Sequence, residues 1–322
     1  MKPHLEISEE QVARTLTVRR SIQLARHAYL KLAKKQVLEP QRTWFKVQGG
    51  ANFYFMPAHI SGLPTVSIKV VSVNHRNPKR GLPSTVATIL VFDSRTGEEV
   101  ARIAGDVLTA IRTAASSALA TDVLARKDVD SLGIVGTGAQ AQAHVAAMLA
   151  VRTFSRVTVY SRSKTHREQF VRKFSETMKI PFIVASSADQ VARESDVLVL
   201  ATGSAFPVFN GSMVQSGGHV NAIGASLPNM REMDTNLVRR SILVVDSRKQ
   251  ALETYGDMII PLKEGAIRES HIRAELGELL LYHISLRRRE KDITVFKAGG
   301  LGVLDAFFAN YIVSRSRDWR QL

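Results

Sequence analysis

The feature that most constrains this chain is a series of short apolar strands that alternates with helical segments from Ser131 onward. The strands read LGIVG, RVTVY, PFIVA, DVLVLAT, HVNAIG and ILVVDS, and all are rich in Val, Ile and Leu. Such runs are typical of strands buried on both faces, and their alternation with helices predicts a doubly wound parallel sheet. The expected fold is therefore α/β, with a Rossmann-type sheet.

The residues before Ser131 have a different pattern of expected helices and strands. Two helices are expected near the N-terminus, the first opened by a capping-box pattern at Ser8. Between Thr43 and Gly105, about five β-rich runs are broken by Gly- and Pro-containing turns, which predicts a largely antiparallel meander. An alanine-rich helix is expected from Asp106, and the C-terminal AFFANYIVSRSRDW is amphipathic and helical. If that last helix returns to the first domain, the expected domains are 1–118 with 302–322, and 119–301.

Bulk composition narrows the function classes. The chain has 322 residues, a formal net charge of +15 and no cysteine, so disulfides and thiolate chemistry are excluded. Its 44 Lys and Arg residues are spread along the chain, and the densest run, RRREK at 287–291, is of mixed charge. Such a run is typical of a solvated face, so nucleic acid is not an expected partner. There is no secretory signal and no apolar run of membrane-spanning length, so a cytoplasmic location without membrane attachment is expected.

The segment GIVGTGAQAQAH carries the G-x-G-x-x-A form of the dinucleotide-binding fingerprint. Gly136 allows a tight turn, Gly138 lets the backbone approach a pyrophosphate, and Ala141 permits close packing of the helix on its strand. The fingerprint follows an expected strand and opens an expected helix, whose N-terminus attracts phosphate. Thr137, Ala139 and Gln140 of this loop are therefore expected to contact the cofactor too.

The next strand, RVTVY, ends in Ser161, Arg162, Ser163 and Lys164. An NAD-preferring site usually has an acidic residue here for the ribose 2′-hydroxyl, whereas two cations and two hydroxyls suit a 2′-phosphate. NADPH is therefore the expected cofactor, with NADH as a possible substitute. The alternative is that Arg162 and Lys164 are solvent-exposed loop cations and that the enzyme accepts either cofactor.

Several strings in a fixed order resemble the ornithine cyclodeaminase/mu-crystallin family. They are DVLTAIRTAASSALATDVLA, GTGAQAQAH, AIGASLPNMREMD, the VVDS strand, AELGEL and TVFKAGGLGVLD. The resemblance extends from near Glu6 to near Ser314. It implies a dinucleotide-binding domain inserted into a substrate-binding and dimerisation domain, a homodimer, and hydride transfer at the α-carbon of an amino or imino acid.

The same resemblance implies a clamp for the substrate carboxylate made by Arg42, Lys69 and Arg112. Guanidinium and ammonium groups suit the orientation of a small carboxylate. Each residue also has a plainer interpretation: Lys69 alternates with apolar residues and suits an outward-facing strand position, Arg112 a helix surface, and Arg42 a loop. Met56 is expected to line the substrate pocket, with core packing as the alternative.

The resemblance implies further cofactor contacts. They are Thr85, Thr113, Ala201, Thr202, Gly224, Ser226 and Gly300. In the family the TVFKSxG region packs near the nicotinamide. Here Ala298 replaces the usual serine, while Lys297 and Asp305 remain, the latter as a possible partner of a clamp cation. His59, His75 and His219 have no spacing with acids that suits a metal, so no metal site is expected.

Two carboxylates of the cyclodeaminases are missing. Tyr54 stands where those enzymes have a glutamate, and Ser226 where they have an aspartate. Oxidative deamination removes a proton from an ammonium group, and a serine hydroxyl has no practical basicity at neutral pH. The substitutions therefore disfavour ornithine cyclodeaminase and alanine dehydrogenase. They favour the mu-crystallin-like ketimine reductases, which reduce a cyclic imine such as Δ1-pyrroline-2-carboxylate or Δ1-piperideine-2-carboxylate with NADPH to proline or pipecolate.

The proton donor of such a reduction is expected to be Lys69 or a water held by Ser226, and Tyr54 joins the substrate-binding set. Two alternatives stay open. An opine-like imine reductase would need a larger pocket near Trp44, Tyr54 and Phe55. A protein that only binds NADPH or another small molecule would have no need of a carboxylate clamp.

Overall fold

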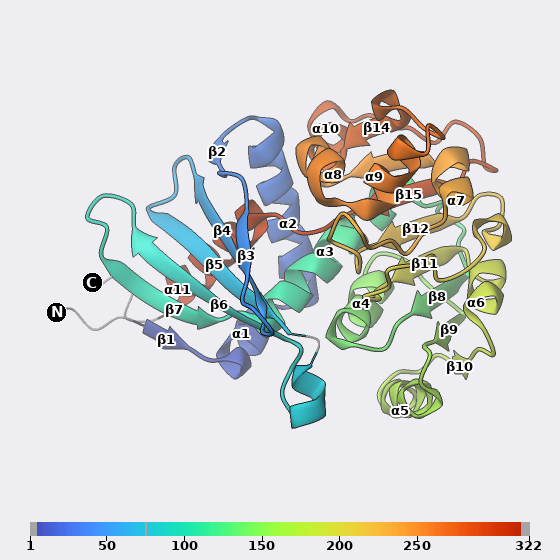
Figure 1. Cartoon of the computed structure of the whole chain (residues 1–322), viewed down its shortest axis with the longest axis horizontal. Helices are drawn as coiled ribbons and strands as arrows, with labels where there is room; N and C mark the ends of the chain where they lie inside the picture. The colour runs from blue at the N-terminus through green and yellow to red at the C-terminus, as the bar shows by residue number, and fades with distance from the viewer. Residues whose placement is uncertain (1–4, 75, 317–322) are drawn as a thin grey trace. The chain divides into compact units, whose positions relative to one another are not determined.

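The computed structural model describes residues 5–74 and 76–316, so His75 lies outside the described residues (Figure 1). The chain divides into two compact units. Unit 1 contains Met1–Arg112 and Leu301–Leu322, and unit 2 contains Thr113–Gly300. The first boundary lies within helix α3 (Asp106–Leu124), so residues 113–118 fall in unit 2 rather than in the first domain as the sequence suggested.

Unit 1 is built on a seven-stranded sheet. Its strands are β1 (Leu5–Ile7), β2 (Val37–Leu38), β3 (Thr43–Lys46), β4 (Asn52–Ile60), β5 (Thr65–Val73), β6 (Thr85–Asp93) and β7 (Glu99–Ala104). The strand order is β1-β7-β6-β5-β4-β2, and β3 also pairs with β4. The expected antiparallel meander is confirmed for β4 to β7. The parallel pairing of β1 with β7 was not expected from the sequence.

The first two helices of unit 1 begin at side-chain caps, Ser8 and Thr17. The helices of this unit are α1 (Glu9–Thr15), α2 (Val18–Ala33) and α11 (Gly302–Arg315), besides the start of α3 and a short 3₁₀ turn, Asn77–Arg80. The capping box of α1 at Ser8 and the two N-terminal helices are confirmed. Helix α11 packs against β4, β5 and β6 and against α2, and it covers the inner face of the sheet.

Unit 2 contains an eight-stranded parallel sheet, which confirms the expected α/β fold. Its strands are β8 (Ser131–Val135), β9 (Arg156–Tyr160), β10 (Phe182–Val184), β11 (Val197–Leu200), β12 (His219–Ala222), β13 (Ile242–Val245), β14 (Ile272–Glu275) and β15 (Thr294–Lys297). Their order is β10-β9-β8-β11-β12-β15-β13-β14. The order reverses between β8 and β11, which is the position where doubly wound sheets bind ligands at the carboxyl ends of the strands.

The continuous apolar runs of the sequence form the centre of this sheet. Every residue of β8, β11, β12 and β15 is buried, as expected for strands covered on both faces. The helices of unit 2 connect these strands. They are α4 (Ala139–Leu149), α5 (Lys164–Ser175), α6 (Ala188–Glu194), α7 (Thr235–Arg240), α8 (Arg248–Thr254), α9 (Gly256–Lys263) and α10 (Leu276–Tyr282), with 3₁₀ turns at Gly211–Met213 and Glu269–His271.

Helix α3 joins the two units in the chain. Among the described residues it is the one helix long and apolar enough to cross a membrane by length and composition, and 72% of its apolar window is buried inside the structure. Its small residues, such as Ala114, Ala115 and Ala118, are almost fully buried. It is therefore packed as a core helix.

Candidate active site

Two cations of unit 1 share one buried carboxylate. Asp305 Oδ2 lies 2.6 Å from Lys69 Nζ, and Asp305 Oδ1 accepts a hydrogen bond of 3.0 Å from Arg112 Nε. All three side chains are almost fully buried, at 2% exposure for Lys69, 6% for Arg112 and 1% for Asp305. Charges taken this far from water are tolerated only when they are paired. The sequence-predicted Lys69 and Arg112 are thus brought together by an acid that was named only as a possible partner.

Three elements place these side chains. On β5, Thr65, Ser67 and Lys69 alternate with half-buried residues and face the covered side of the sheet, so the outward-facing interpretation of Lys69 is wrong. Arg112 lies on α3, where it is buried rather than on the helix surface. Asp305 lies in the first turn of α11, where a negative charge is favoured by the helix dipole.

Helix α11 is itself held by a remote cap. Glu39 accepts hydrogen bonds from the amides of Gly302 (2.7 Å) and Val303 (3.4 Å). Its carboxylate replaces the local cap that the sequence lacks, because the residue before the helix is Leu301. The start of α11, and with it Asp305, is therefore held in place by Glu39, the residue that follows β2 in the same unit.

The electrostatics of the cluster act on Lys69. Burial lowers the pKa of the Lys69 ammonium to about 8, and the neighbouring Arg112 and, more weakly, Arg42 push in the same direction. Asp305 opposes them through its charge and its hydrogen bond. A lysine with a pKa near neutrality can give up a proton and regain it, which an ordinary surface lysine does poorly.

The other expected substrate residues are near the same strands. The Arg42 guanidinium lies 5.4 Å from the centre of the Tyr54 ring, a cation–π distance. Burial raises the pKa of the Tyr54 phenol, and the charge of Arg42 partly offsets this effect. Met56 is buried and sits opposite Lys69 in the β4–β5 pairing. Thr85, by contrast, is exposed at the start of β6.

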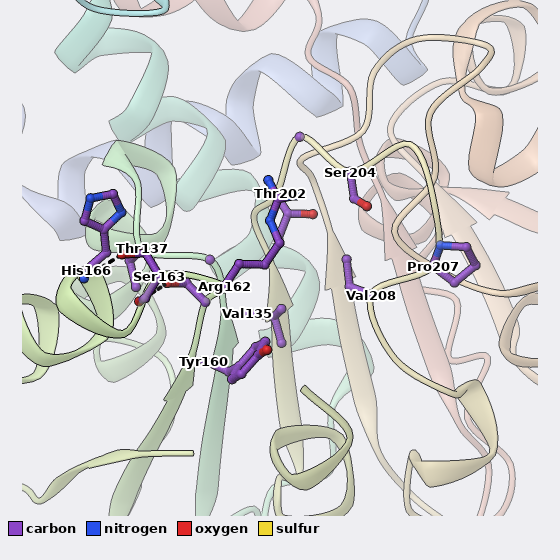
Figure 2. Close-up of a pocket in the computed structure, with 13 residues that line it drawn as sticks. Val135, Thr137, Tyr160, Arg162, Ser163, His166, Thr202, Ser204, Pro207 and Val208 are labelled. Carbon is purple, nitrogen blue, oxygen red and sulfur yellow. Dashed lines mark hydrogen bonds between the residues drawn. The ribbon is translucent and has the colours of Figure 1, made fainter. Parts of the chain in front are cut away.

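Unit 2 contains a pocket of about 530 Å³ at the carboxyl ends of β8, β9 and β11 (Figure 2). Its lining residues are Val135, Gly136, Thr137, Tyr160, Ser161, Arg162, Ser163, His166, Thr202, Gly203, Ser204, Pro207 and Val208. This volume is within the range of small-molecule and cofactor sites. Six of the expected cofactor residues, from Gly136 to Thr202 in sequence, therefore line one pocket.

The phosphate loop fits a dinucleotide. Gly136 has φ of +113°, and a Cβ at this position would lie 2.4 Å from the carbonyl oxygen of Ala201. Only glycine can therefore make the turn at this distance from the neighbouring strand. Gly138 is the N-cap of α4 and has no side-chain cap, so the first amides of the helix remain free of a side-chain acceptor. Amides at such a position suit a pyrophosphate.

The loop after β9 provides the second wall of the pocket. Ser163 caps α5 by accepting from the His166 amide, and Ser161 Oγ donates to the Ser163 carbonyl at 3.2 Å. Figure 2 shows the Arg162 side chain extending from this loop toward Thr202. Lys164 does not line the pocket, and it forms an exposed ion pair with Glu168 at 3.8 Å.

The remaining expected cofactor residues do not line this pocket. They are Thr85, Thr113, Gly138, Ala139, Gln140, Lys164, Ala201, Gly224, Ser226 and Gly300. Gly224 and Ser226 follow β12, and Gly300 follows β15, at the same edge of the sheet as the pocket. Gly138 lines a smaller adjacent pocket of about 340 Å³ with Thr137 and His166.

Several lining residues were missed by the sequence reasoning. Tyr160 directly precedes the ribose loop, and His166 lies in the first turn of the following helix. Both are within four residues of Arg162 in sequence, so their contribution to the pocket could have been predicted. Pro207 and Val208 belong to an irregular loop with no motif. Glu232 does not line the pocket, but it is fully buried, and the sequence had suggested no role for it.

Comparison with known proteins places this geometry in a family. The family model described as the ornithine cyclodeaminase/mu-crystallin family matches residues 4–319. Delta(1)-pyrroline-2-carboxylate reductase of Bacillus cereus is 33% identical over 97% of this chain and 96% of that protein. Ketimine reductase mu-crystallin of Mus musculus is 35% identical over 86% of this chain and 84% of that protein.

A solved structure agrees with these relatives. The Delta(1)-pyrroline-2-carboxylate reductase of Thermococcus litoralis, in complex with NADH and L-proline, superposes with a TM-score of 0.93 at 35% identity, with 96% of each chain covered. An archaeal alanine dehydrogenase dimer with bound NAD superposes at 0.90 and 27% identity, with 96% of this chain and 94% of that chain covered. The chain belongs to the ornithine cyclodeaminase/mu-crystallin family, and it is an NAD(P)H-dependent oxidoreductase.

Proposed function

We propose that this protein reduces a cyclic ketimine, Δ1-pyrroline-2-carboxylate or Δ1-piperideine-2-carboxylate, to the cyclic amino acid with NADPH. The observation that carries the proposal is the buried cluster of Lys69, Arg112 and Asp305. It supplies cations for a substrate carboxylate and a lysine whose pKa is about 8. The names of the relatives, pyrroline-2-carboxylate reductase and ketimine reductase, support the same reaction.

Lys69 and Arg112 of the cluster, together with Arg42, have direct roles in this proposal. Arg112 and Arg42 orient the substrate carboxylate, and Lys69 donates a proton to the imine nitrogen as the C=N bond becomes CH–NH. A reduced nicotinamide, when bound, would supply the hydride for the α-carbon. Lys69 then regains its proton from solvent, and a pKa of about 8 suits both steps.

The acids that oxidative deamination would need are occupied or replaced. Asp305 is committed to two cations, so it is not available as a free base. The resemblance to the cyclodeaminases implies carboxylates at two positions where this chain has Tyr54 and Ser226. Reduction requires less of the protein, because an imine that Lys69 protonates is electrophilic without a further base, and the substrate then mainly needs orientation.

The first prediction concerns substrate and direction. The purified protein with NADPH should oxidise the cofactor in the presence of either cyclic ketimine, followed at 340 nm. It should form no proline from ornithine, and no reduced cofactor from alanine, when NAD⁺ or NADP⁺ is supplied. Proline formed from ornithine without added imine would contradict the reductase assignment.

The second prediction concerns Lys69. The ammonium form donates the proton, so imine reduction at fixed substrate should fall as the pH rises through about 8. Lys69→Met should remove this dependence and lower kcat by roughly 100-fold or more. A wild-type profile without a transition near pH 8, together with an active Lys69→Met, would instead point to a water held by Ser226.

The cofactor preference is also part of the proposal. Two serines, Arg162 and His166 line the pocket at the end of β9, and the described part of that loop, Ser161–Lys164, has no acid for a ribose 2′-hydroxyl. Such a donor set suits a 2′-phosphate. The Thermococcus litoralis relative was solved with NADH, so a preference for NADPH is a property to be tested on this chain.

The third prediction tests Arg162. Arg162→Ala should lower kcat/KM for NADPH by about tenfold or more, the effect of one lost charge-assisted contact, with little change for NADH. Arg172→Ala, which removes an exposed charge from the far end of α5, is the matched control and should alter neither value. Equal losses with both cofactors would mean that Arg162 does not read the 2′-phosphate.

We infer that the protein is a homodimer that works in the cytoplasm. The outward positions of the unit 1 sheet are apolar and only half-buried, including Phe55, Ile68, Val70 and Leu90. An antiparallel sheet with a solvated face would carry polar residues there. Val86 and Phe45 are more exposed still, at 44% and 51%, and Phe45 stacks on Phe53 and Phe55 of the same face. An apolar sheet face of this kind is typical of a subunit interface.

The fourth prediction tests this interface. Ile68 lies opposite Pro57 and Leu90 in the middle of the outward face. Ile68→Glu should convert a dimer into a monomer by light scattering after gel filtration, because a charge would be buried at the interface. Ile183→Glu, which changes an exposed apolar residue on edge strand β10 of unit 2, should remain dimeric. A dimeric Ile68→Glu would place the interface elsewhere.

A further inference from the structure

Glu232 is a buried carboxylate that is surrounded by hydrogen-bond donors. Its Oε1 accepts from the amide and the hydroxyl of Thr202, at 2.6 and 2.8 Å. Its Oε2 accepts from the amides of Gly224 and Ala225, at 2.7 and 3.2 Å. A carboxylate can accept on both oxygens, whereas a glutamine would turn an N–H group toward donors. The site therefore requires the acid and not only its shape.

These donors belong to two loops at the carboxyl edge of the sheet. Thr202 is the second residue after β11, and Gly224 and Ala225 follow β12. The main chain of Glu232 holds the other end of the first loop, because its carbonyl accepts from the Val208 amide at 2.9 Å. One residue thus fixes both ends of residues 202–208, which provide a wall of the dinucleotide pocket (Figure 2).

The loops held in this way are in direct backbone contact. A Cβ on Gly224 would lie 2.0 Å from the Thr202 carbonyl oxygen and 2.6 Å from Glu232 Oε1. A Cβ on Gly136 would lie 2.4 Å from the Ala201 carbonyl oxygen. The phosphate loop, residues 201–202 and Gly224 are therefore stacked without side chains between them. In such close packing a shift of one layer displaces the next.

Two further buried charges hold Glu232 in place. Asp257 Oδ1 accepts from the amides of Glu232 and Met233, at 2.8 and 2.9 Å. Asp257 Oδ2 lies 2.8 Å from Lys297 Nζ, and Lys297 also donates to the Ala225 carbonyl. Glu232, Asp257 and Lys297 are all fully buried. The network thus joins the ends of β12 and β15 to the loop after β11.

We propose that Glu232 is a positioning residue for the dinucleotide, holding the pocket wall at 202–208 and the loop at 224–225 in register with the phosphate loop. The inference rests on the proposed dinucleotide site in this pocket, and it does not depend on which imine is reduced. Removing the carboxylate should loosen the wall and weaken dinucleotide binding, without touching the Lys69 cluster in unit 1.

Glu232→Gln tests this proposal, with Asp234→Asn as its matched control. Asp234 is two residues away, and its carboxylate accepts from the amides of Gly211 and Leu237, neither of which lines the pocket. Both variants lose a structural carboxylate, so both should melt at a lower temperature. Only Glu232→Gln should raise the Kd for NADPH, read from the fluorescence of the reduced nicotinamide, by about tenfold or more.

Kinetics separate positioning from general damage. Glu232→Gln should raise the KM for NADPH, while the KM for the imine at saturating NADPH stays within about twofold, less than the loss of one contact. Glu232→Asp keeps the charge on a shorter arm and should show a smaller shift in the same direction if Glu232→Gln does not fold. Wild-type NADPH affinity in the folded variants, or an equal loss in Asp234→Asn, would overturn the proposal. A wild-type protein that bound neither NADPH nor NADH would overturn the dinucleotide site itself.

Discussion

The chemistry of unit 1 depends on one constraint, namely that two cations buried beside each other need a shared anion. Lys69 and Arg112 repel each other, and burial disfavours the charged form of the lysine. Asp305 meets both within 3.0 Å and is as deeply buried as they are. Without it the pKa of Lys69 would fall further, so less of the lysine would carry the proton that the proposed reduction needs.

This constraint explains why the fold takes the form that it does around the cluster. Helix α11 comes from the end of the chain, packs on β4, β5 and β6, and places Asp305 opposite Lys69 of β5. The Glu39 cap fixes where that helix begins. A buried carboxylate has a similar role in unit 2. Glu232 accepts hydrogen bonds from two loops, just as Asp305 pairs with two cations. In both units, a buried carboxylate sets the position of groups that are distant in the sequence.

The fold could be predicted in large part because burial on both faces leaves a direct record in the sequence. Strands such as β8 and β11 are apolar throughout, and the phosphate loop is marked by Gly136, whose conformation other residues rarely adopt. Strand β1 was missed because three residues carry too little periodicity. Strand β14 was missed because it was read only as part of the AELGEL string.

The site was harder to predict, for a physical reason that the structure makes plain. The alternation of polar and apolar residues around Lys69 did not indicate which side of the sheet is covered. Ile68 and Val70 are apolar, yet they lie on the outward side. Only the resemblance to a family selected this lysine. Glu232 reaches Thr202 across thirty residues of sequence, and no spacing rule connects an acid to a set of backbone amides that far away.

The measurement that tests the account most directly is imine reduction by Asp305→Asn. The asparagine keeps the volume of the side chain and removes the charge that Lys69 and Arg112 share. The account predicts that kcat/KM for the cyclic ketimine falls by about 100-fold or more, because both orientation and proton donation depend on this charge. The Kd for NADPH should be unchanged, which also shows that the variant is folded. Imine reduction near the wild-type rate by a folded Asp305→Asn would contradict the central role given to the buried carboxylate.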